Sequence, residues 1–82
     1  MSIAAWSAMN GYLKILVKLL EEDPNQLHAK DEKGRTLMHY AAAGGQLEVM
    51  KWLKDTAGLD VKAADNRGYN ACTYAAAGTL IA

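Results

Sequence analysis

The sequence predicts an all-α protein, a helical solenoid of stacked helix-turn-helix units joined by hairpin-like β-turns. Three observations lead to this fold class. The 82-residue chain matches itself at a shift of 34 residues, helix-capping residues recur in one register, and glycines recur at the turns. The matched positions pair Ser2 with Thr36, Trp6 with Tyr40, Asp31 with Asp65, Gly34 with Gly68, and Tyr40 with Tyr74. Units of this size cannot bury their apolar faces alone, so they are expected to stack.

The repeats divide one domain, residues 1–82, into three units. Repeat 1 covers residues 1–30 and lacks its leading turn, repeat 2 covers residues 31–64, and repeat 3 covers residues 65–82 and is truncated before its second helix. A chain of this length supports one small core. Cys72 is the single cysteine, so the chain has no internal disulfide, which fits a reducing compartment.

Repeat 2 begins with the turn sequence DEKG at 31–34. The carboxylate of Asp31 is expected to accept hydrogen bonds from the backbone amides ahead of it, and Gly34 is expected to take a positive φ. Thr36 then occupies the N-cap position of a helix. Ser2 and Asn70 hold the same register in the other repeats, and all three residue types are good caps.

Two helices are expected in repeat 2, over residues 37–43 and 47–55, because glycines at 44 and 45 end the first one. The apolar stripe of the second helix consists of Leu47, Val49, Met50 and Leu53. In repeat 1 the strongest helical pattern, LKILVKLLEED, starts at Leu13 and stops before Pro24.

Charge and hydropathy exclude two classes of partner. Nine Lys and Arg balance nine Asp and Glu, so the chain lacks the basic footprint of a dedicated nucleic-acid binder. No stretch reaches the ~18 apolar residues of a membrane span, and the N-terminus lacks a signal-peptide pattern. We therefore expect no nucleic-acid partner, no membrane partner, and a cytoplasmic or nuclear location.

The repeat resembles the ankyrin repeat over essentially the whole chain. The family pattern runs approximately D-x-x-G-x-T-P-L-H-x-A-A-x-x-G-x-L-E-V-V-K-x-L, and repeat 2 reads DEKGRTLMHYAAAGGQLEVMKWL from Asp31. Leu37 and Met38 replace the family's Pro and Leu, and Ala5 stands where repeat 1 would carry the His. The resemblance implies a non-enzymatic scaffold for protein–protein interaction, with no cofactor and a partner protein bound by turn tips and a concave helix face.

The resemblance also implies which residues contact the partner. They are the variable residues of the turns and of the ends of the first helices: Met9, Asn10, Glu32, Lys33, Arg35, Ala43, Asn66, Arg67, Tyr69 and Ala77.

One aromatic residue recurs in each repeat, as Trp6, Tyr40 and Tyr74. Two interpretations of this ladder stay open. If its helix face is concave, the ladder contacts a partner, since Trp and Tyr supply large and stiff contact areas. Otherwise it packs between adjacent first helices. We expect the tyrosine hydroxyls to meet water or a partner.

Other candidate residues have simpler explanations. Lys33, Arg35 and Arg67 lie at or beside the turn tips, where they dock an acidic peptide or serve solubility. His39 is expected to be structural and to hydrogen-bond the preceding turn, since a zinc site needs three or four ligands. Cys72 occupies an apolar position of the repeat and is expected to be a buried, inert thiol.

Two alternatives accompany partner binding. The chain is the N-terminal ankyrin segment that positions another domain of a larger protein, or it forms a homodimer through its uncovered third repeat, where Ala75, Leu80 and Ile81 lack a covering helix. An enzyme is disfavoured because no convergent set of titratable residues is visible.

Overall fold

The computed structural model describes residues 2–81, with side chains through residue 76. Its helices are α1 (Ile3–Asn10), α2 (Leu13–Glu22), the 3-10 helix η1 (Pro24–His28), α3 (Leu37–Ala43), α4 (Leu47–Asp55) and α5 (Ala71–Ile81). The helices expected over 37–43, over 47–55 and from Leu13 are confirmed at those bounds. Residues 2–81 contain no strand.

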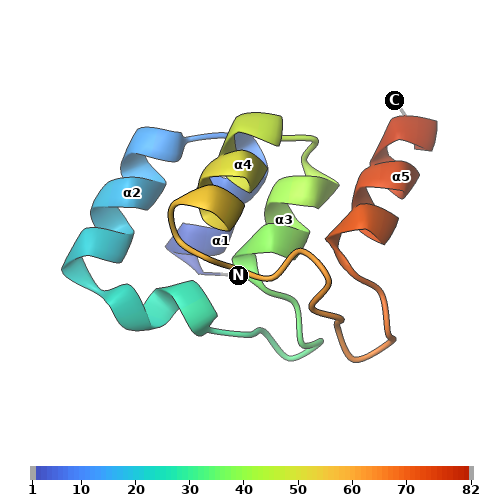
Figure 1. Ribbon diagram of the computed structural model, residues 1–82, viewed down its shortest axis with the longest axis horizontal. Coiled ribbons are helices and arrows are strands. Elements are labelled where there is room, and N and C mark those ends of the chain that lie inside the picture. Colours follow the sequence, from blue (N-terminus) through green and yellow to red (C-terminus); the bar gives the residue numbers. More distant parts are fainter. Residues whose placement is uncertain (1, 82) are drawn as a thin grey trace.

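The helices form a solenoid with one inner layer. α1 packs against α3, and α3 packs against α5, while α2 and α4 form the outer helices of repeats 1 and 2 (Figure 1). The turns that lead into α3 and α5 project from the same end of the molecule. Repeat 3 contributes the inner helix α5, and the described chain ends with it.

The three predicted caps begin the three inner helices. Ser2 Oγ accepts the Ala5 amide at 3.1 Å, and Asn70 Oδ1 accepts the Thr73 amide at 3.0 Å. Thr36 caps α3 in partnership with His39, three residues on. Each cap satisfies a backbone donor that a helix start otherwise leaves without a partner.

The core lies between the layers and is mostly aliphatic. Its largest aliphatic members, all less than a tenth exposed, are Leu16, Leu20, Leu37, Met38, Val49 and Leu53. Small alanines on α1 and α3 let the inner helices approach closely. Of the stripe expected on α4, Val49 and Leu53 are buried and Met50 is half-buried, but Leu47 is 75% exposed. The interpretation of Leu47 as a packing residue was therefore wrong.

The burial expected for Cys72 from its position in the repeat is also not found. Cys72 aligns with Met38, which is buried in one cluster with Val49 and Leu53 of α4. Cys72 is exposed, because the described part of repeat 3 has no second helix to cover it. The expectation of a buried thiol was wrong for this reason.

The inner helices α1 and α3 meet at a glycine. A Cβ atom added to Gly44 would lie 1.9 Å from the Met9 carbonyl oxygen. Gly44 has φ −85°, so its backbone is one that any residue adopts, and the contact alone demands glycine. The neighbouring Gly45 has φ 67° and open space around its added Cβ.

We predict that Gly44→Ala lowers the free energy of unfolding by more than about 2 kcal/mol, since backbone atoms must move apart to admit the methyl group. Gly45→Ala is the matched control, with an expected loss of about 1 kcal/mol from left-handed strain alone. Urea unfolding followed by circular dichroism measures both. Equal losses would show that the Met9 contact does not constrain the fold.

Candidate partner-binding surface

Each projecting turn is organised by one aspartate. In the first tip, residues 31–34, Asp31 Oδ1 accepts the amides of Lys33 and Arg35 at 2.9 and 2.8 Å. Its Oδ2 accepts the Tyr40 hydroxyl and forms an ion pair with Arg35 Nε at 2.7 Å. The Arg35 guanidinium also lies over the Tyr40 ring, 5.0 Å from its centroid. The first tip is thus tied to α3, and Asp31 has the role expected for it.

The second tip, residues 65–68, repeats this arrangement. Asp65 Oδ1 accepts the amides of Arg67 and Tyr69 at 2.8 and 3.0 Å, and its Oδ2 accepts the Tyr74 hydroxyl. Tyr69 occupies the position in repeat 3 that Arg35 occupies in repeat 2. Asp65 therefore lacks the arginine partner that Asp31 has at this position. Tyr69 is 46% exposed.

The two tips are joined to each other through Asn66. Its backbone amide donates to the Lys33 carbonyl at 2.8 Å, and its side-chain Nδ2 donates to the Glu32 carbonyl at 3.0 Å. The tips therefore lie side by side and have a fixed relative position (Figure 1).

His39 joins the tips to the inner layer. Its Nδ1 accepts the Thr36 amide at 3.1 Å, and its Nε2 donates to the Tyr69 carbonyl at 2.8 Å. An amide only donates and a carbonyl only accepts, so the neutral ring carries its proton on Nε2. The ring also meets Tyr74 edge-on, with centroids 5.0 Å apart. His39 is structural, as expected, but it links to the following turn as well as to the residue that caps its own helix.

The carboxylates and tyrosines of the tips have shifted pKa values. Burial works to raise the pKa of Asp31, but hydrogen bonds from Tyr40 and Arg35 outweigh it and hold that pKa well below its usual range. The hydrogen bond from Tyr74 lowers the pKa of Asp65. Burial, then the hydrogen bond to the Asp65 carboxylate, raises the pKa of Tyr74 to about 12. Burial likewise raises the pKa of Tyr40.

The expected contact residues divide into exposed and supporting positions. The exposed ones are Asn10, Glu32, Lys33, Ala43, Asn66, Arg67 and Tyr69. Met9, Arg35 and Tyr74 are half-buried, and Tyr40 is 6% exposed. The side chain of Ala77 lies outside the described residues.

Core packing of the aromatic ladder is confirmed for Tyr40, and contact of the ladder with a partner stays a prediction. Tyr40 packs in the core, Tyr74 packs against its edge, and Trp6 is 47% exposed. The hydroxyls of Tyr40 and Tyr74 donate to Asp31 and Asp65, so the expectation that they meet water or a partner was wrong. Each tyrosine lies nine residues after its aspartate, and this spacing in both repeats was the available signal.

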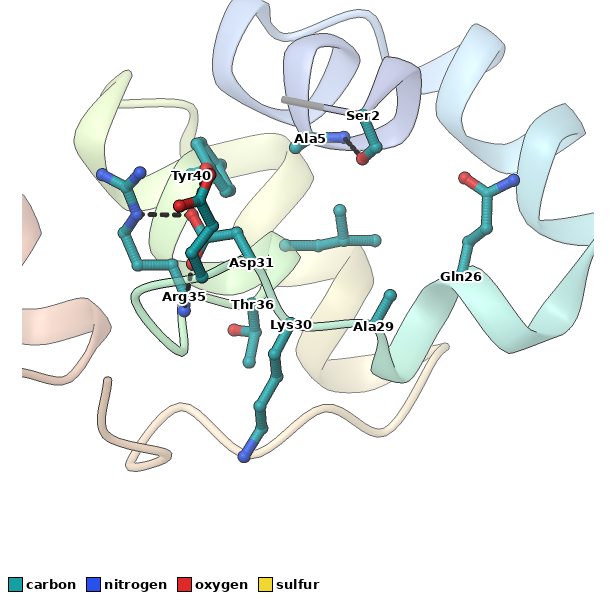
Figure 2. A pocket seen from close by; sticks show the side chains of 11 residues that line it. Ser2, Ala5, Gln26, Ala29, Lys30, Asp31, Arg35, Thr36 and Tyr40 are labelled. Carbon is teal, nitrogen blue, oxygen red and sulfur yellow. Dashed lines mark hydrogen bonds and ion pairs between the residues drawn. The ribbon is translucent and has the colours of Figure 1, made fainter. Parts of the chain in front are cut away.

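A pocket of about 380 Å³ opens beside the first tip, between the start of α1, η1 and the chain that leads into α3. Figure 2 shows Ser2 and Ala5 on one side of it, Tyr40, Asp31 and Arg35 on another, and Gln26 across from them. The sequence held one signal for this pocket, because Ala5 stands in the register of His39.

Two other kinds of site receive no support from residues 2–81. Within the part of the chain that the structure describes, no group of three or more His, Cys, Asp or Glu side chains is placed to hold a metal ion. Among the same residues, no helix has the length and apolar character needed to cross a membrane.

The fold and its tips define a repeat protein of stacked helix pairs with projecting turns. The chain belongs to the ankyrin-repeat family, since the family model "Ankyrin repeats (3 copies)" matches residues 2–80. Ankyrin repeats are generally protein–protein interaction modules and are typically non-enzymatic. The serine/threonine-protein kinase VIK of Arabidopsis thaliana is 41% identical over 52 residues, which cover 63% of this chain and 12% of the kinase.

Two solved structures contain similar folds. One is that of the Bd0816 predatory endopeptidase from Bdellovibrio bacteriovorus in complex with immunity protein Bd3460. The matched chain has a TM-score of 0.86 and 26% identity, with 99% of this chain and 42% of that chain covered. The other is that of the yeast ribosomal protein Rps3 in complex with its chaperone Yar1. The match has a TM-score of 0.82 and 25% identity, with 93% of this chain and 57% of that chain covered.

We predict that stability depends on pH through the tip pairs. Because the pKa values of Asp31 and Asp65 are lowered on folding, their contribution to the free energy of unfolding is complete above about pH 3.9. It is lost as the pH falls through the lowered pKa values. Because the pKa values of Tyr40 and Tyr74 are raised on folding, their contribution to stability is complete below about pH 10 and is lost as the pH rises through the raised values, which for Tyr74 is about 12.

Urea unfolding from acid to alkaline pH tests this expectation. Tyr74→Phe should lower the free energy of unfolding at neutral pH by about 1–2 kcal/mol, because it removes a hydrogen bond to a carboxylate. It should also flatten the alkaline decline. Tyr12→Phe, at a hydroxyl outside the tips, should change neither. A Tyr74→Phe profile that overlies that of the wild type would contradict the assignment.

Proposed function

We propose that the protein binds a partner protein through its two tips and the exposed residue at the C-terminal end of α3. The surface, called the tip surface below, consists of Glu32, Lys33, Ala43, Asn66, Arg67 and Tyr69. One observation carries the proposal: hydrogen bonds fix the backbone of both tips, yet these side chains are exposed. Binding to such a preorganised surface costs little backbone entropy.

The charge of the tip surface favours an acidic segment of the partner. Lys33 and Arg67 are exposed, and the ion pair found among the described residues joins Arg35 to Asp31 instead. Lys30, beside the tip surface, adds a third exposed cation, so the exposed cations here outnumber the exposed carboxylate of Glu32. Opposite charges on a partner would speed association and fix its orientation. Both similar structures are of protein complexes, which also supports protein binding.

Tyr40, Arg35 and Tyr74 support this surface from within. Their hydrogen bonds to the tip aspartates make them unsuitable for testing contact, because substitution there disturbs the tips themselves. The exposed cations Lys33 and Arg67 are better probes.

We predict that Lys33→Glu, Arg67→Glu weakens capture of the partner at least tenfold, since two favourable charge contacts become repulsive. The measurement is affinity capture from cell extract with quantitative mass spectrometry. Lys14→Glu, Lys18→Glu on α2 is the matched control, with the same change in net charge at exposed positions away from the tips.

The expected result is a protein held by the wild type and by the α2 variant but lost by the tip variant, while all three melt at similar temperatures. Proteins that are retained by the tip variant, or lost equally from both variants, would overturn the tip surface as the binding site.

A specific observation also favours self-association, through repeat 1. Leu37, Tyr40 and Val49 are buried in repeat 2, at 3%, 6% and 1% exposure. The residues at the equivalent positions of repeat 1 are exposed: Ile3, Trp6 and Ile15 have exposures of 66%, 47% and 48%. We call these three residues the open face. Tyr12 packs on Trp6 with ring centroids 5.1 Å apart and extends this face. The third repeat, where self-association was first expected, has Leu80 and Ile81 outside the residues with described side chains.

We propose that a second copy covers the open face, since exposed apolar area favours burial by roughly 25 cal/mol per Å². Sedimentation velocity should show a dimer that Trp6→Ser weakens about tenfold. Leu47→Ser, at an exposed leucine outside the open face, should leave it unchanged. A wild-type monomer at high concentration would exclude this proposal and leave the tip surface unaffected.

A further inference from the structure

The pocket beside the first tip occupies the same place in the boundary between repeats 1 and 2 that the His39 ring occupies in the boundary between repeats 2 and 3. The shift of 34 residues carries Ser2 onto Thr36 and Ala5 onto His39. It likewise carries the other two pocket residues that matter here, Arg35 and Tyr40, onto Tyr69 and Tyr74. Ser2, Ala5, Arg35 and Tyr40 all line the pocket (Figure 2).

The filled boundary shows how such a place holds an imidazole. The ring of His39 accepts the Thr36 amide at 3.1 Å through Nδ1 and donates to the Tyr69 carbonyl at 2.8 Å through Nε2. It packs edge-on against Tyr74 at 5.0 Å. The Thr36 hydroxyl also lies 3.0 Å from Nδ1. The amide and hydroxyl of Thr36, one carbonyl acceptor and one aromatic ring therefore surround the imidazole.

The open boundary presents the corresponding amide, carbonyl and aromatic ring, from Ser2, Arg35 and Tyr40. Ser2 has the extended N-cap backbone of Thr36, with φ −76° and ψ 163° against −100° and 176°, so its amide takes the corresponding place. The Arg35 carbonyl accepts the Asp31 amide, as the Tyr69 carbonyl accepts that of Asp65. The Tyr69 carbonyl accepts a second hydrogen bond, from His39, whereas no second donor to the Arg35 carbonyl is found among the described residues.

We propose that this pocket, named the azole pocket, binds the imidazole of a histidine from a partner polypeptide. The ring would accept from the Ser2 amide, donate to the Arg35 carbonyl and pack on Tyr40. This source of the ring rests on the proposed function of partner recognition, whereas the capacity of the pocket for an imidazole does not. A side chain such as lysine, which only donates, would leave the Ser2 amide without an acceptor.

The size of the pocket agrees with this occupant. Its volume of about 380 Å³ exceeds that of one imidazole ring and falls in the range of small-molecule pockets. The additional room, bordered by Gln26 and Ala29, accommodates the backbone that carries a histidine.

Titration with 4-methylimidazole, the side chain of histidine, tests the azole pocket by amide shifts in NMR spectra. We expect saturable shifts at Ser2, Ala5 and Arg35 with a dissociation constant in the range of roughly 1–30 mM, as suits a fragment with few atoms. 1-Methylimidazole lacks the N–H that would donate to the Arg35 carbonyl and should bind about five- to tenfold more weakly.

Ala5→His is the matched variant, since its own ring should fill the azole pocket as His39 fills the other boundary. It should lose the response to 4-methylimidazole and melt at a higher temperature. A blocked glycine-histidine-glycine peptide should shift the same wild-type amides, and a blocked glycine-alanine-glycine peptide should not.

The outcomes are distinct. Absence of saturable shifts with 4-methylimidazole, equal binding of both methylimidazoles, or an undiminished response in folded Ala5→His would overturn the azole pocket. Binding of 4-methylimidazole without binding of the histidine peptide would overturn the polypeptide as its source. Since the comparison of the methylimidazoles uses the wild-type protein alone, it holds even if Ala5→His fails to fold, and it is independent of the charge variants that test the tip surface.

Discussion

One aspartate carboxylate in each tip is the interaction on which the rest of the surface depends. Asp31 and Asp65 each bind two backbone amides with one oxygen and a tyrosine hydroxyl with the other. The first oxygen closes the turn, and the second fixes the turn against the inner helix that follows it. An exposed loop thereby gains the rigidity of the helix layer without burying its own outward side chains.

The boundaries between repeats are similar in backbone and different in chemistry. Asn66 and His39 connect repeat 2 to repeat 3 through three hydrogen bonds, two from Asn66 and one from the His39 ring. Repeat 1 has Ala5 in the histidine register, so its boundary with repeat 2 relies mainly on apolar packing of α1 on α3 and on the close approach at Gly44. One hydrogen bond crosses this boundary, from Gln46 Nε2 to the Met9 carbonyl at 3.3 Å. The loss of one ring converts a polar junction into an accessible pocket.

The sequence predicted the helices, their caps and the turn role of Asp31, because these depend on neighbours within one repeat. Contacts that depend on what covers a position were harder to predict. Cys72 and Met38 share a register, but α4 packs beside Met38 and no described helix covers Cys72. The bond between Tyr40 and Asp31 joins residues nine apart, so neither turn nor helix periodicity reveals it. The ligand of the azole pocket could not be predicted from the sequence, because it follows from the contacts that the His39 ring makes in the boundary between repeats 2 and 3.

The order of contacts along the solenoid has a consequence for how recognition and folding are linked. The inner helices touch in sequence, α1 on α3 and α3 on α5, so stability resembles a sum of unit terms and nearest-neighbour terms. The two tips belong to different units. A ligand that contacts both tips adds its binding free energy to the interaction between repeats 2 and 3. Repeat 3 then opens less often on its own, and the repeats unfold more cooperatively.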